Sequence, residues 1–388
     1  MKICVIGLGY VGYPLFELFS EKYDTYGIDI PSRVKELNNP KIVSHYTVIE
    51  DCDFVFVCVP TPIDDKNQPD YTALDEVSGY ISQHLRKDQI VVYESTVGPD
   101  TIRLRCCGNL KYHNNLFYNR DFFVVYSPER VSPGVTGMEL KNLTKLVACP
   151  DEVARKKTEK LYQSVGINTY PCKDYRVAEM SKLLENIQRD VNVALMNEFA
   201  WICSRFEGLK FMDVLNAAKT KENFIPYTMG MVGGHCIPVD PYLLINDHRL
   251  RDGGAPLINM ARQNNKSMID SLAKDISEKF KKYKHICILG ASYKENVGDL
   301  RESGSLKLYK KLISLMPDDC YVSLHDPLID RYSYFPEDAD CYVLAVPHSW
   351  YDDNKFYYDK PLYDVKGAWY GRDHLFKEYY SYGEGEKS

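Results

Sequence analysis

The sequence has no long apolar run, no closely paired cysteines and no excess of positive charge. None of its apolar stretches approaches the roughly eighteen residues that a membrane-spanning helix needs, so no membrane contact is expected. The formal net charge is −6 at pH 7, which gives no overall attraction to nucleic acid. The twelve cysteines are scattered and include no C-x-x-C pair, so most of them should be small buried hydrophobic residues rather than redox or zinc ligands.

The N-terminal segment also lacks the features of an export signal. It reads MKICVIGLG, in which one lysine precedes a short apolar run that a glycine interrupts. This pattern is typical of a buried strand and predicts a cytoplasmic protein. At 388 residues the chain is too long for one ordinary hydrophobic core, so two or three domains are expected.

A glycine-rich turn follows the first expected strand, Lys2–Ile6. The turn reads GLGYVG, and a helix-like segment and a second strand ending near Asp29 come after it. This order is typical of a dinucleotide-binding unit, with the phosphates at the start of the helix and a ribose hydroxyl on the acidic residue. We therefore predict NAD as the cofactor, although Arg33 could receive the extra phosphate of NADP. The expected contacts in the turn are Gly7, Gly9, Tyr10, Val11 and Gly12.

Three further apolar runs each end in a polar or proline-containing loop. FVFVCV begins at Phe54, IVVYE at Ile90 and FFVVY at Phe122. Continuous apolar runs of this length are typical of parallel strands that are covered on both faces. Because ligands in such sheets bind beyond the carboxyl ends of the strands, the loops PTP, STVGP and SPERVSPG should line one crevice. The candidate residues in these loops are Thr61, Ser95, Thr96 and Glu129.

A long helix and a second α/β unit follow. Residues 176–206 contain neither proline nor glycine and place apolar residues at helical spacing, which predicts one helix long enough to pair with its copy in a dimer. Lys182 and Asn186 are four residues apart and so share a face of it. From His285 the order of strand, glycine turn, helix and strand repeats. The tail from Tyr380 is expected to fray.

The stretch VGGHCIPVDPYLL, residues 232–244, holds one cysteine among glycines and prolines. The glycines allow a bulky ligand to approach the backbone, and the prolines should stiffen the turn that holds Cys236 four residues before Asp240. Three interpretations are open: a structural turn with a buried cysteine, a metal site that includes His235, and a nucleophile beside an acid–base group. The spacing fits zinc poorly, so no metal is predicted. The dinucleotide-type fold favours the nucleophile.

A cysteine that works with a nicotinamide cofactor implies a particular oxidation. Hydride leaves most readily from an sp3 carbon that bears oxygen, so an aldehyde must first become a tetrahedral adduct. A thiolate provides this adduct as a thiohemiacetal, and loss of hydride then gives a thioester that water hydrolyses to a carboxylate. Two oxidations in one site would use two NAD in succession.

Seven segments resemble, in order, the signature segments of the UDP-glucose/GDP-mannose dehydrogenase family. They are GLGYVG, VPTP, ESTVGPDT, SPERVSPG, AEMSKLLENIQRDVNVALMNE, VGGHCIPVDPY and GASYKENVGDLRES. The resemblance implies an NAD-dependent enzyme that oxidises C6 of a nucleotide sugar from alcohol to acid. It also implies an α/β fold of two Rossmann-like doubly wound domains joined by a long central helix, which forms the core of a homodimer. The implied domains are 1–174 for NAD, 175–282 for dimerisation and the catalytic cysteine, and 283–388 for the UDP-sugar.

The same resemblance implies roles for residues at the matching positions. Cys236 resembles the nucleophile, Asp240 its partner that positions or activates a water, and Glu129 the glutamate implicated in thioester hydrolysis. Lys182 and Asn186 resemble the pair that stabilises negative charge on the C6 oxygen. The other implied contacts are Thr96 near the nicotinamide, Thr61, Ser95 and Arg301 on the cofactor, and Gly233, Gly234, Arg262 and Lys294 on the substrate.

Three segments resemble the corresponding sequences in the branch of the family that acts on UDP-N-acetylhexosamines. They are SPERVSPG, ENIQRDVNVALMNE and GGHCIPVDPY. We therefore expect such a substrate, with UDP-glucose as the alternative and a uronic acid for surface polysaccharide as the product. A non-catalytic nucleotide-sugar-binding protein would not need the cysteine, and a 3-hydroxyacid-type dehydrogenase would perform one oxidation without it. The segment between Asp29 and Phe54 is shorter than the resemblance implies, so we expect it to affect cofactor affinity.

Overall fold

The computed structural model describes residues 1–111, 115–130, 140–250, 253–354 and 357–385. The chain divides into two compact units: unit 1 is Met1–Glu185 with Tyr242–Gly254, and unit 2 is Asn186–Pro241 with Ala255–Ser388. Each unit contains its own sheet flanked by helices. The predicted α/β class with two Rossmann-like domains is therefore confirmed.

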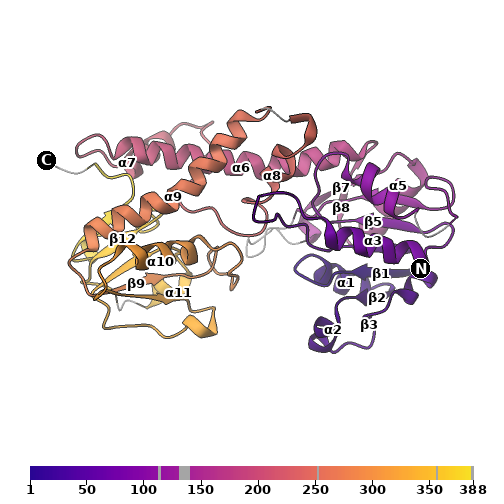
Figure 1. Cartoon of the computed structure of the whole chain (residues 1–388), viewed down its shortest axis with the longest axis horizontal. Coiled ribbons are helices and arrows are strands. Elements are labelled where there is room, and N and C mark those ends of the chain that lie inside the picture. The colour runs from indigo at the N-terminus through magenta and orange to yellow at the C-terminus, as the bar shows by residue number, and fades with distance from the viewer. Residues whose placement is uncertain (112–114, 131–139, 251–252, 355–356, 386–388) are drawn as a thin grey trace. The chain divides into compact units, whose positions relative to one another are not determined.

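Unit 1 is built on an eight-stranded sheet in the order β3-β2-β1-β4-β5-β6-β7-β8 (Figure 1). All neighbouring strands are parallel except β6 and β7, which are antiparallel. The strands are β1 Lys2–Ile6, β2 Asp24–Ile28, β3 Ile42–Val43, β4 Phe54–Val57, β5 Ile90–Tyr93, β6 Phe123–Tyr126, β7 Thr144–Ala148 and β8 Asn168–Cys172. The first six strands have the order of a dinucleotide-binding sheet, in which the ligand lies beyond the carboxyl ends.

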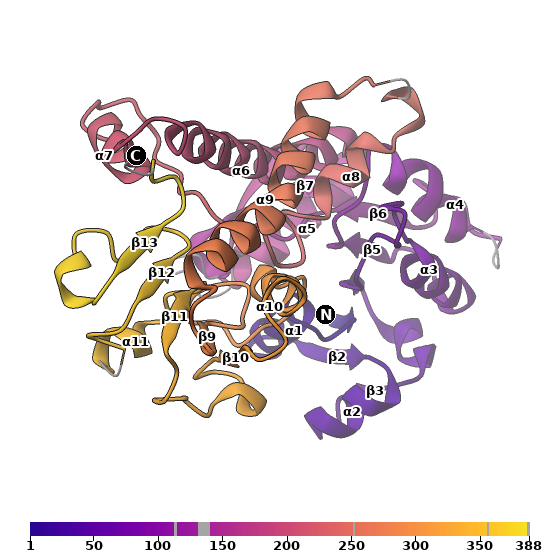
Figure 2. The same ribbon diagram turned by 60° about the vertical axis from the view of Figure 1, so that its left-hand side comes forward.

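Helices cover both faces of this sheet, which explains its continuous apolar strands. Successive side chains of β1 point to opposite faces: Cys4 and Ile6 belong to the core under α3, whereas Ile3 and Val5 belong to the core under α1 and α5. Figure 2 shows α3 and α4 beside β5 and β6. The helical elements are α1 Gly12–Ser20, α2 Pro31–Leu37, η1 Tyr46–Asp51, α3 Thr72–His84, η2 Ile102–Cys106, α4 Cys107–Asn109, η3 Leu140–Asn142, α5 Glu152–Ser164 and η4 His248–Leu250.

The longest helix among the described residues, α6, spans Tyr175–Cys203. It corresponds to the helix predicted over residues 176–206. It ends at Cys203 because the chain then turns toward Gly208, whose positive φ of 69° is a conformation that glycine adopts at little cost. No helix among the described residues is both long and apolar enough to cross a membrane.

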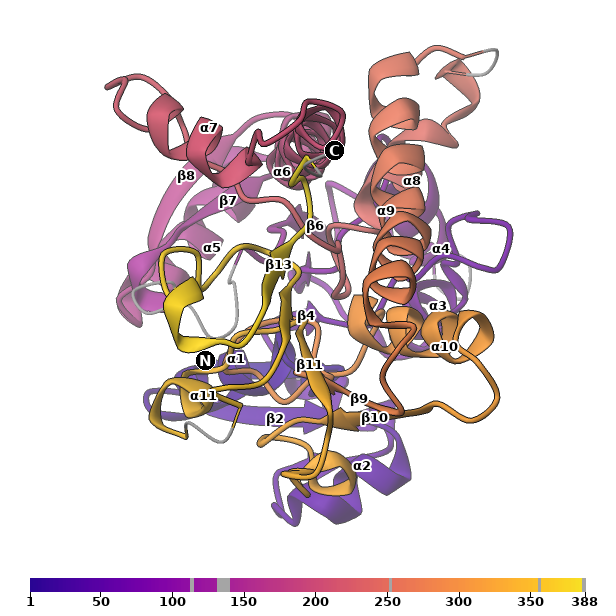
Figure 3. The ribbon, with the colours of Figure 1, turned by 90° about the vertical axis from the view of Figure 1, so that its left-hand side faces the viewer.

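Unit 2 contains a parallel five-stranded sheet in the order β10-β9-β11-β12-β13. Ile286 and Ile288 of β9 pack with α9 and α10, and Cys287 and Leu289 pack on the opposite face with α11 and an aromatic cluster (Figure 3). The strands are β9 His285–Leu289, β10 Tyr321–His325, β11 Cys341–Leu344, β12 Leu362–Asp364 and β13 Tyr379–Ser381. The helical elements are α7 Phe211–Ala218, α9 Pro256–Phe280, α10 Gly304–Leu315, η5 Asp330–Tyr332, α11 Ser349–Asp353 and η6 Asp373–Leu375, and α8 Asp240–Ile245 begins in this unit.

The prediction that the tail frays from Tyr380 is wrong. Tyr379–Ser381 forms β13 and pairs in parallel with β12. The chain beyond it is also held, because Phe211 donates a backbone hydrogen bond to Gly383 at 3.1 Å and Gly385 donates one to Leu209 at 2.9 Å. The tail therefore completes the sheet of unit 2.

Candidate functional site

The glycine turn after β1 leaves room for a ligand at one of its three glycines. Gly7 has a positive φ of 86°, and a Cβ atom on it would lie 2.8 Å from the carbonyl oxygen of Cys58. A Cβ on Gly12 would lie 1.9 Å from the carbonyl oxygen of Gly7, whereas one on Gly9 would meet nothing within 4 Å. The protein itself thus requires Gly7 and Gly12, and the open space beside Gly9 suits a pyrophosphate at the start of α1.

Tyr10 and Val11 complete this turn and precede α1. Tyr10 is exposed and Val11 is half-buried. The turn residues therefore present both backbone and side chains at the carboxyl end of β1. Their predicted cofactor contacts remain predictions.

Asp29 lies directly after β2 and is fixed against the glycine turn. Its Oδ2 accepts a hydrogen bond from the backbone N–H of Leu8 at 2.6 Å, and its Oδ1 accepts one from Ile30 at 2.7 Å. Each carboxylate oxygen can accept a second hydrogen bond, so Asp29 retains capacity for a ribose hydroxyl. Arg33 is paired instead with Glu36, with 2.5 Å between Nη1 and Oε1, so its guanidinium is already engaged.

The loops after β4 and β5 are tied together by two hydroxyl groups. Thr61 donates a hydrogen bond to the carbonyl of Thr96 at 2.6 Å, and Ser95 donates one to the carbonyl of Val59 at 2.6 Å. Thr96 itself is half-buried. The structure therefore brings Thr61, Ser95 and Thr96 together at the carboxyl edge of the sheet, as the loop positions predicted.

Glu129, which follows β6, belongs to a buried charged cluster that sequence reasoning missed. Nζ of Lys145 lies 3.3 Å from Oε2 of Glu129 and 2.5 Å from Oε2 of Glu94, and the hydroxyl of Tyr162 donates a hydrogen bond to Glu94. The backbone N–H of Arg130 donates to Oε1 of Glu129 at 2.6 Å. Residues 131–134, which complete the SPERVSPG segment, lie outside the described residues.

The charges in this cluster shift one another's ionisation. The side chains of Lys145 and Glu94 are 1% and 0% exposed. Burial raises the pKa of Glu94 to about 7, although Lys145 lowers it. Burial by itself lowers the pKa of Lys145, but the charges of Glu129 and Glu94 outweigh it, so this pKa lies above its usual value. Lys145 is therefore a cation at neutral pH.

Cys236 is the exposed cysteine of the chain. Cys58 and Cys320 are half-buried, and the remaining cysteines are buried and free, as the scattered spacing predicted for most of them. Asp240 begins α8 and donates its backbone N–H to the carbonyl of Cys236 at 2.8 Å. The interpretation of a buried structural cysteine is therefore wrong, because Cys236 is an exposed residue.

The Cys236 loop is anchored to α6 through Asp240. Nδ2 of Asn186 donates a hydrogen bond to Oδ2 of Asp240 at 2.6 Å. Asp240 is 3% exposed, and Lys182 and Asn186 are each 7% exposed. Asn186, Asp240 and the backbone of Cys236 thus form one connected group, with Lys182 one helical turn before Asn186.

Gly234 lies against the aromatic ring of Tyr293, and Gly233 lies against the backbone of Glu302. A Cβ atom on Gly234, whose φ is 84°, would lie 2.7 Å from Cε2 of Tyr293, and one on Gly233 would lie 2.9 Å from the carbonyl oxygen of Glu302. The space that we expected a bulky ligand to occupy is therefore used by the protein's own chain. The predicted substrate contacts of both glycines would have to be made by their backbone.

The basic residues predicted to reach phosphates have different surroundings. Burial lowers the pKa of Lys294, and the nearby charge of Arg189 lowers it further. Nη2 of Arg301 lies 2.6 Å from Oδ2 of Asp299. Lys294 and Arg301 belong to the segment that also supplies Tyr293, and their predicted contacts with phosphates remain predictions.

Arg262 makes a buried ion pair. Its Nη1 lies 2.5 Å from Oδ1 of Asp190, and Asn265 donates a hydrogen bond to the same carboxylate oxygen at 2.8 Å. The pair links α9 to α6. This contact accounts for the burial of Arg262, and its predicted substrate contact remains a prediction.

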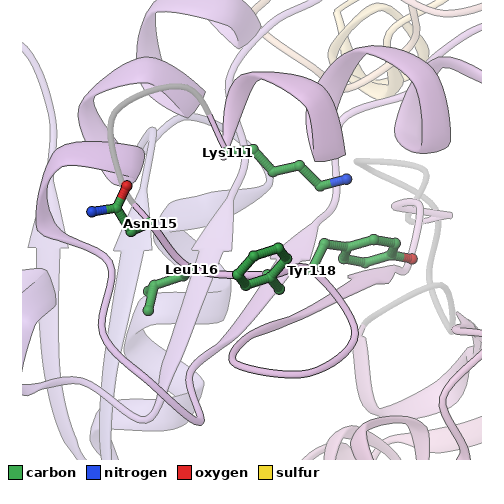
Figure 4. Close-up of a pocket in the computed structure, with 5 residues that line it drawn as sticks. Lys111, Asn115, Leu116 and Tyr118 are labelled. Atoms are coloured by element: carbon green, nitrogen blue, oxygen red, sulfur yellow. The ribbon is translucent and has the colours of Figure 1, made fainter.

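Unit 1 also contains a hollow of about 500 Å³ (Figure 4). It is lined by Lys111, Asn115, Leu116, Phe117 and Tyr118. These residues precede β6, so the hollow lies toward the amino end of that strand, whereas Glu129 follows its carboxyl end. Among the described residues, no group of three or more His, Cys, Asp or Glu side chains is arranged to hold a metal ion.

The order of the first six strands, the glycine turn and the position of Asp29 define a class of protein, a nucleotide-dependent dehydrogenase, in which the exposed Cys236 is the candidate nucleophile. Models of the UDP-glucose/GDP-mannose dehydrogenase family match three consecutive parts of the chain: the NAD binding domain matches residues 43–166, the central domain residues 176–267 and the UDP binding domain residues 287–370. The chain belongs to this family and is an NAD-dependent UDP-sugar dehydrogenase.

The similar proteins cover nearly the whole chain. It is 34% identical to a UDP-N-acetyl-D-glucosamine 6-dehydrogenase of Salmonella typhi over 91% of this chain and 88% of that one. The solved UDP-D-ManNAc dehydrogenase from Pyrococcus horikoshii superposes with a TM-score of 0.84 at 29% identity and covers 100% of both chains. The UDP-N-acetyl-mannosamine dehydrogenase of Staphylococcus aureus superposes with a TM-score of 0.84 at 26% identity, over 99% of this chain and 98% of that one.

Proposed function

We propose that the protein oxidises C6 of a UDP-N-acetylhexosamine to the carboxylate, with two NAD consumed per sugar, in the cytoplasm. Relatives named for UDP-N-acetyl sugars support this substrate class, as does the wording of the three family segments. The observation that carries the chemistry is the exposed Cys236 in a loop fixed by the hydrogen bond between Asp240 and Asn186. An exposed thiol on a fixed backbone is the arrangement that a covalent mechanism needs.

The proposed chemistry begins and ends at Cys236. After the first oxidation, the Cys236 thiolate adds to the C6 aldehyde and forms a thiohemiacetal, and the second oxidation converts it to a thioester. Bound NAD would accept hydride in both oxidations. Water then adds to the thioester carbon, a water proton passes to Glu129, and the C–S bond breaks with the electron pair on sulfur. Asp240 and Thr96 are proposed to position water or substrate during these steps.

Lys182 and Asn186 are proposed to stabilise negative charge on the C6 oxygen. The amide of Asn186 has two N–H donors and uses one on Asp240, so the second is the one for the substrate oxygen. Lys182 lies on the same face of α6 and provides a charged donor. Preorganised donors of this kind contribute roughly 3 kcal/mol each to the transition state.

The nucleotide contacts follow from the two sheets. We propose that the turn residues Gly7, Gly9, Tyr10, Val11 and Gly12 hold the cofactor pyrophosphate. Asp29 would accept from the ribose, and the hydroxyl groups at the carboxyl edge would line the nicotinamide end. The remaining proposed contacts are Thr61, Ser95, Arg33 and Arg301 for the cofactor and Gly233, Gly234, Arg262 and Lys294 for the UDP-sugar. The three-part division into 1–174, 175–282 and 283–388 is proposed on the same basis.

A homodimer is proposed through α6. An apolar stripe runs along this helix, and its members are separated by three, four or eleven residues, which places them on one face. The stripe consists of Val177, Met180, Leu184, Leu195 and Phe199, which are all 44% or more exposed. Covering an exposed apolar stripe of this length with its copy would remove a large apolar area from water.

The first experiment measures NADH formed per mole of sugar. UDP-GlcNAc, UDP-GalNAc, UDP-ManNAc, UDP-glucose and GDP-mannose are offered separately to the purified protein. Two NADH from a UDP-N-acetylhexosamine support the proposal. Two NADH from UDP-glucose alone would mean that UDP-glucose, and not a UDP-N-acetylhexosamine, is the substrate. One NADH from any sugar would contradict the covalent mechanism.

The Cys236→Ser variant tests the nucleophile. We expect it to form no acid, because a serine hydroxyl is a far weaker nucleophile at neutral pH than a thiol, while NAD binding stays unchanged. Cys320→Ser, at a half-buried cysteine of the same unit, is the matched control and should retain full activity. Acid formation by Cys236→Ser at the wild-type rate would rule out the thioester.

A further inference from the structure

Lys145 is a buried cation in the middle of an apolar strand. It lies on β7, which reads TKLVA, and its side chain is 1% exposed. A buried ammonium group is costly unless it is paired. Its partners are the carboxylates of Glu94 and Glu129, at 2.5 and 3.3 Å from Nζ. One buried cation is thus shared between two carboxylates, only one of which has a proposed catalytic role.

Other groups near this cluster come from α5, from α6 and from the loops after β4 and β6. Tyr162 of α5 donates a hydrogen bond to Glu94. Cys58, after β4, is close enough that the charges of Glu94, Lys145 and Glu129 all affect its pKa, which burial raises. Arg130 is engaged by Glu185 of α6, with 2.7 Å between Nη2 and Oε1. Lys145 is thus a cation in direct contact with the side chain of Glu129.

We propose that Lys145 is the positioning residue for Glu129 and that Glu94 competes for the same ammonium group. Lys145 and Glu94 together then set the orientation and the ionisation of the Glu129 carboxylate during thioester hydrolysis. This inference rests on the proposed role of Glu129. Lys145 holds Oε2, and the backbone N–H of Arg130 holds Oε1 at 2.6 Å. The carboxylate is fixed at both oxygens and can still accept a water proton.

The physical reason is the charge balance of a buried site. Without the ammonium group, the buried carboxylate of Glu94 and the half-buried carboxylate of Glu129 repel each other without a compensating cation, which raises the pKa of both. A protonated Glu129 cannot accept a proton from water. Without the negative charge of Glu94, Lys145 acts on Glu129 alone, and Glu129 stays ionised to lower pH. The two substitutions therefore act in opposite directions.

The test compares Lys145→Met with Glu94→Gln. The rate of acid release after the second NADH is measured between pH 5 and 9 by rapid quench, and the acylated protein is detected by intact mass. We expect the acid limb of the profile to move up by about one pH unit or more in Lys145→Met, with accumulation of the thioester. In Glu94→Gln it should move down. The KM for NAD and the rate of the first NADH should not change in either variant.

A double variant is included in case Lys145→Met does not fold. Lys145→Met leaves two carboxylates without a cation and is the variant that could fail to fold. The double variant Lys145→Met/Glu94→Gln removes one charge of each sign, so it should fold and show an acid limb above that of Glu94→Gln. If the double variant has the same acid limb and rate as Glu94→Gln, Lys145 does not position Glu129.

Glu129→Gln separates failure of this inference from failure of the proposed function. Loss of hydrolysis in Glu129→Gln, together with an unchanged profile in both Lys145→Met and Glu94→Gln, would overturn the role of Lys145 alone. Hydrolysis by Glu129→Gln at the wild-type rate would overturn the role of Glu129, and this inference with it. Movement of both acid limbs in the same direction would contradict the competition between Glu94 and Glu129.

Discussion

Glu36 holds the guanidinium group of Arg33 at 2.5 Å, and Asp29 is held by the backbone of the glycine turn. In this arrangement the acidic residue remains available to a ribose hydroxyl. The arginine, which alone would favour a 2′-phosphate, is neutralised by its neighbour one turn along α2. We therefore expect the cofactor preference to depend on Asp29, Arg33 and Glu36 together rather than on Asp29 by itself.

We expect the wild-type protein to prefer NAD to NADP, and Glu36→Gln to narrow this preference by at most about fivefold, because an exposed ion pair contributes under about 1 kcal/mol. The measurement is kcat/KM for both cofactors. Glu152→Gln is the control, since it removes a comparable surface pair with Lys156 on another helix of the same unit. Equal kcat/KM values for NAD and NADP in the wild-type protein would contradict the role of Asp29.

At the scale of elements, α6 carries the site residues on one face and an exposed apolar stripe on another. Asn186 and Lys182 are buried, whereas Leu184 between them is 67% exposed. A single helix therefore presents both the proposed oxyanion donors and the proposed dimer contact. Changes in the stripe are expected to alter assembly before they alter chemistry.

Leu184→Glu should convert the proposed dimer to a monomer, because it places a charge in the middle of the apolar stripe that the dimer would bury. The oligomeric state is measured by light scattering after size exclusion. Leu104→Glu is the matched control, since Leu104 is 61% exposed on η2 and should leave the dimer intact. A monomeric wild-type protein, or a dimeric Leu184→Glu variant, would show that the stripe serves another purpose.

Asp326 connects the ends of three strands in unit 2. It accepts hydrogen bonds from the backbone N–H groups of Ala291 and Ser292 after β9, at 2.9 and 2.7 Å, and its Oδ2 lies 3.2 Å from Nε2 of His348 after β11. Burial alone would raise its pKa, but hydrogen bonds from His348 and Ser292 outweigh burial and lower the pKa to about 2.

We expect Asp326→Asn to destabilise unit 2 by about 2–3 kcal/mol at pH 7, because charge-assisted hydrogen bonds are lost. The folded-state pKa lies below the unfolded value of 3.8, so the stabilisation is present above pH 3.8 and is lost as the pH falls through about 2. Urea unfolding at several pH values should show the difference from wild type shrinking in that range. Asp338→Asn, at a side chain 82% exposed, should have no effect at any pH.

The sequence predicts well those elements whose chemistry is local. Lys2–Ile6 is a strand with the predicted bounds because both of its faces are buried, and the glycine spacing of its turn is the local pattern that predicted a cofactor there. Tyr379–Ser381 is missed because a strand of three residues has too few positions to show a period. The buried ion pairs of Lys145 are missed for another reason. A lysine in a short strand is usually solvent-exposed, and the carboxylate partner Glu94 is distant from Lys145 in the sequence.

At the scale of the whole molecule, the two units have separate hydrophobic cores. The NAD binding model falls within unit 1 and the UDP binding model within unit 2. The cores of unit 1 surround the eight-stranded sheet, and those of unit 2 surround the five-stranded sheet. Each nucleotide should therefore stabilise a different part of the protein.

We expect calorimetry to show that NAD and UDP raise different parts of the unfolding profile. A ligand at about 100 times its Kd stabilises the unit that binds it by about 2.7 kcal/mol, which should be visible as a shift of a few degrees. NAD should act on the transition of unit 1 and UDP on that of unit 2. A single transition that both ligands shift equally would mean that the two units unfold together.

The ring of Tyr293 beside Gly234 has a practical consequence for engineering. The cysteine loop and the segment that supplies the ring are separated by more than fifty residues of sequence, yet neither shape is possible without the other. Grafting VGGHCIPVD into another scaffold would transfer the thiol without the Tyr293 ring against which the loop packs. A graft of the cysteine loop therefore has to include two separate segments of the chain. Substitutions at residue 293 should also change the conformation of the loop at residues 233–236.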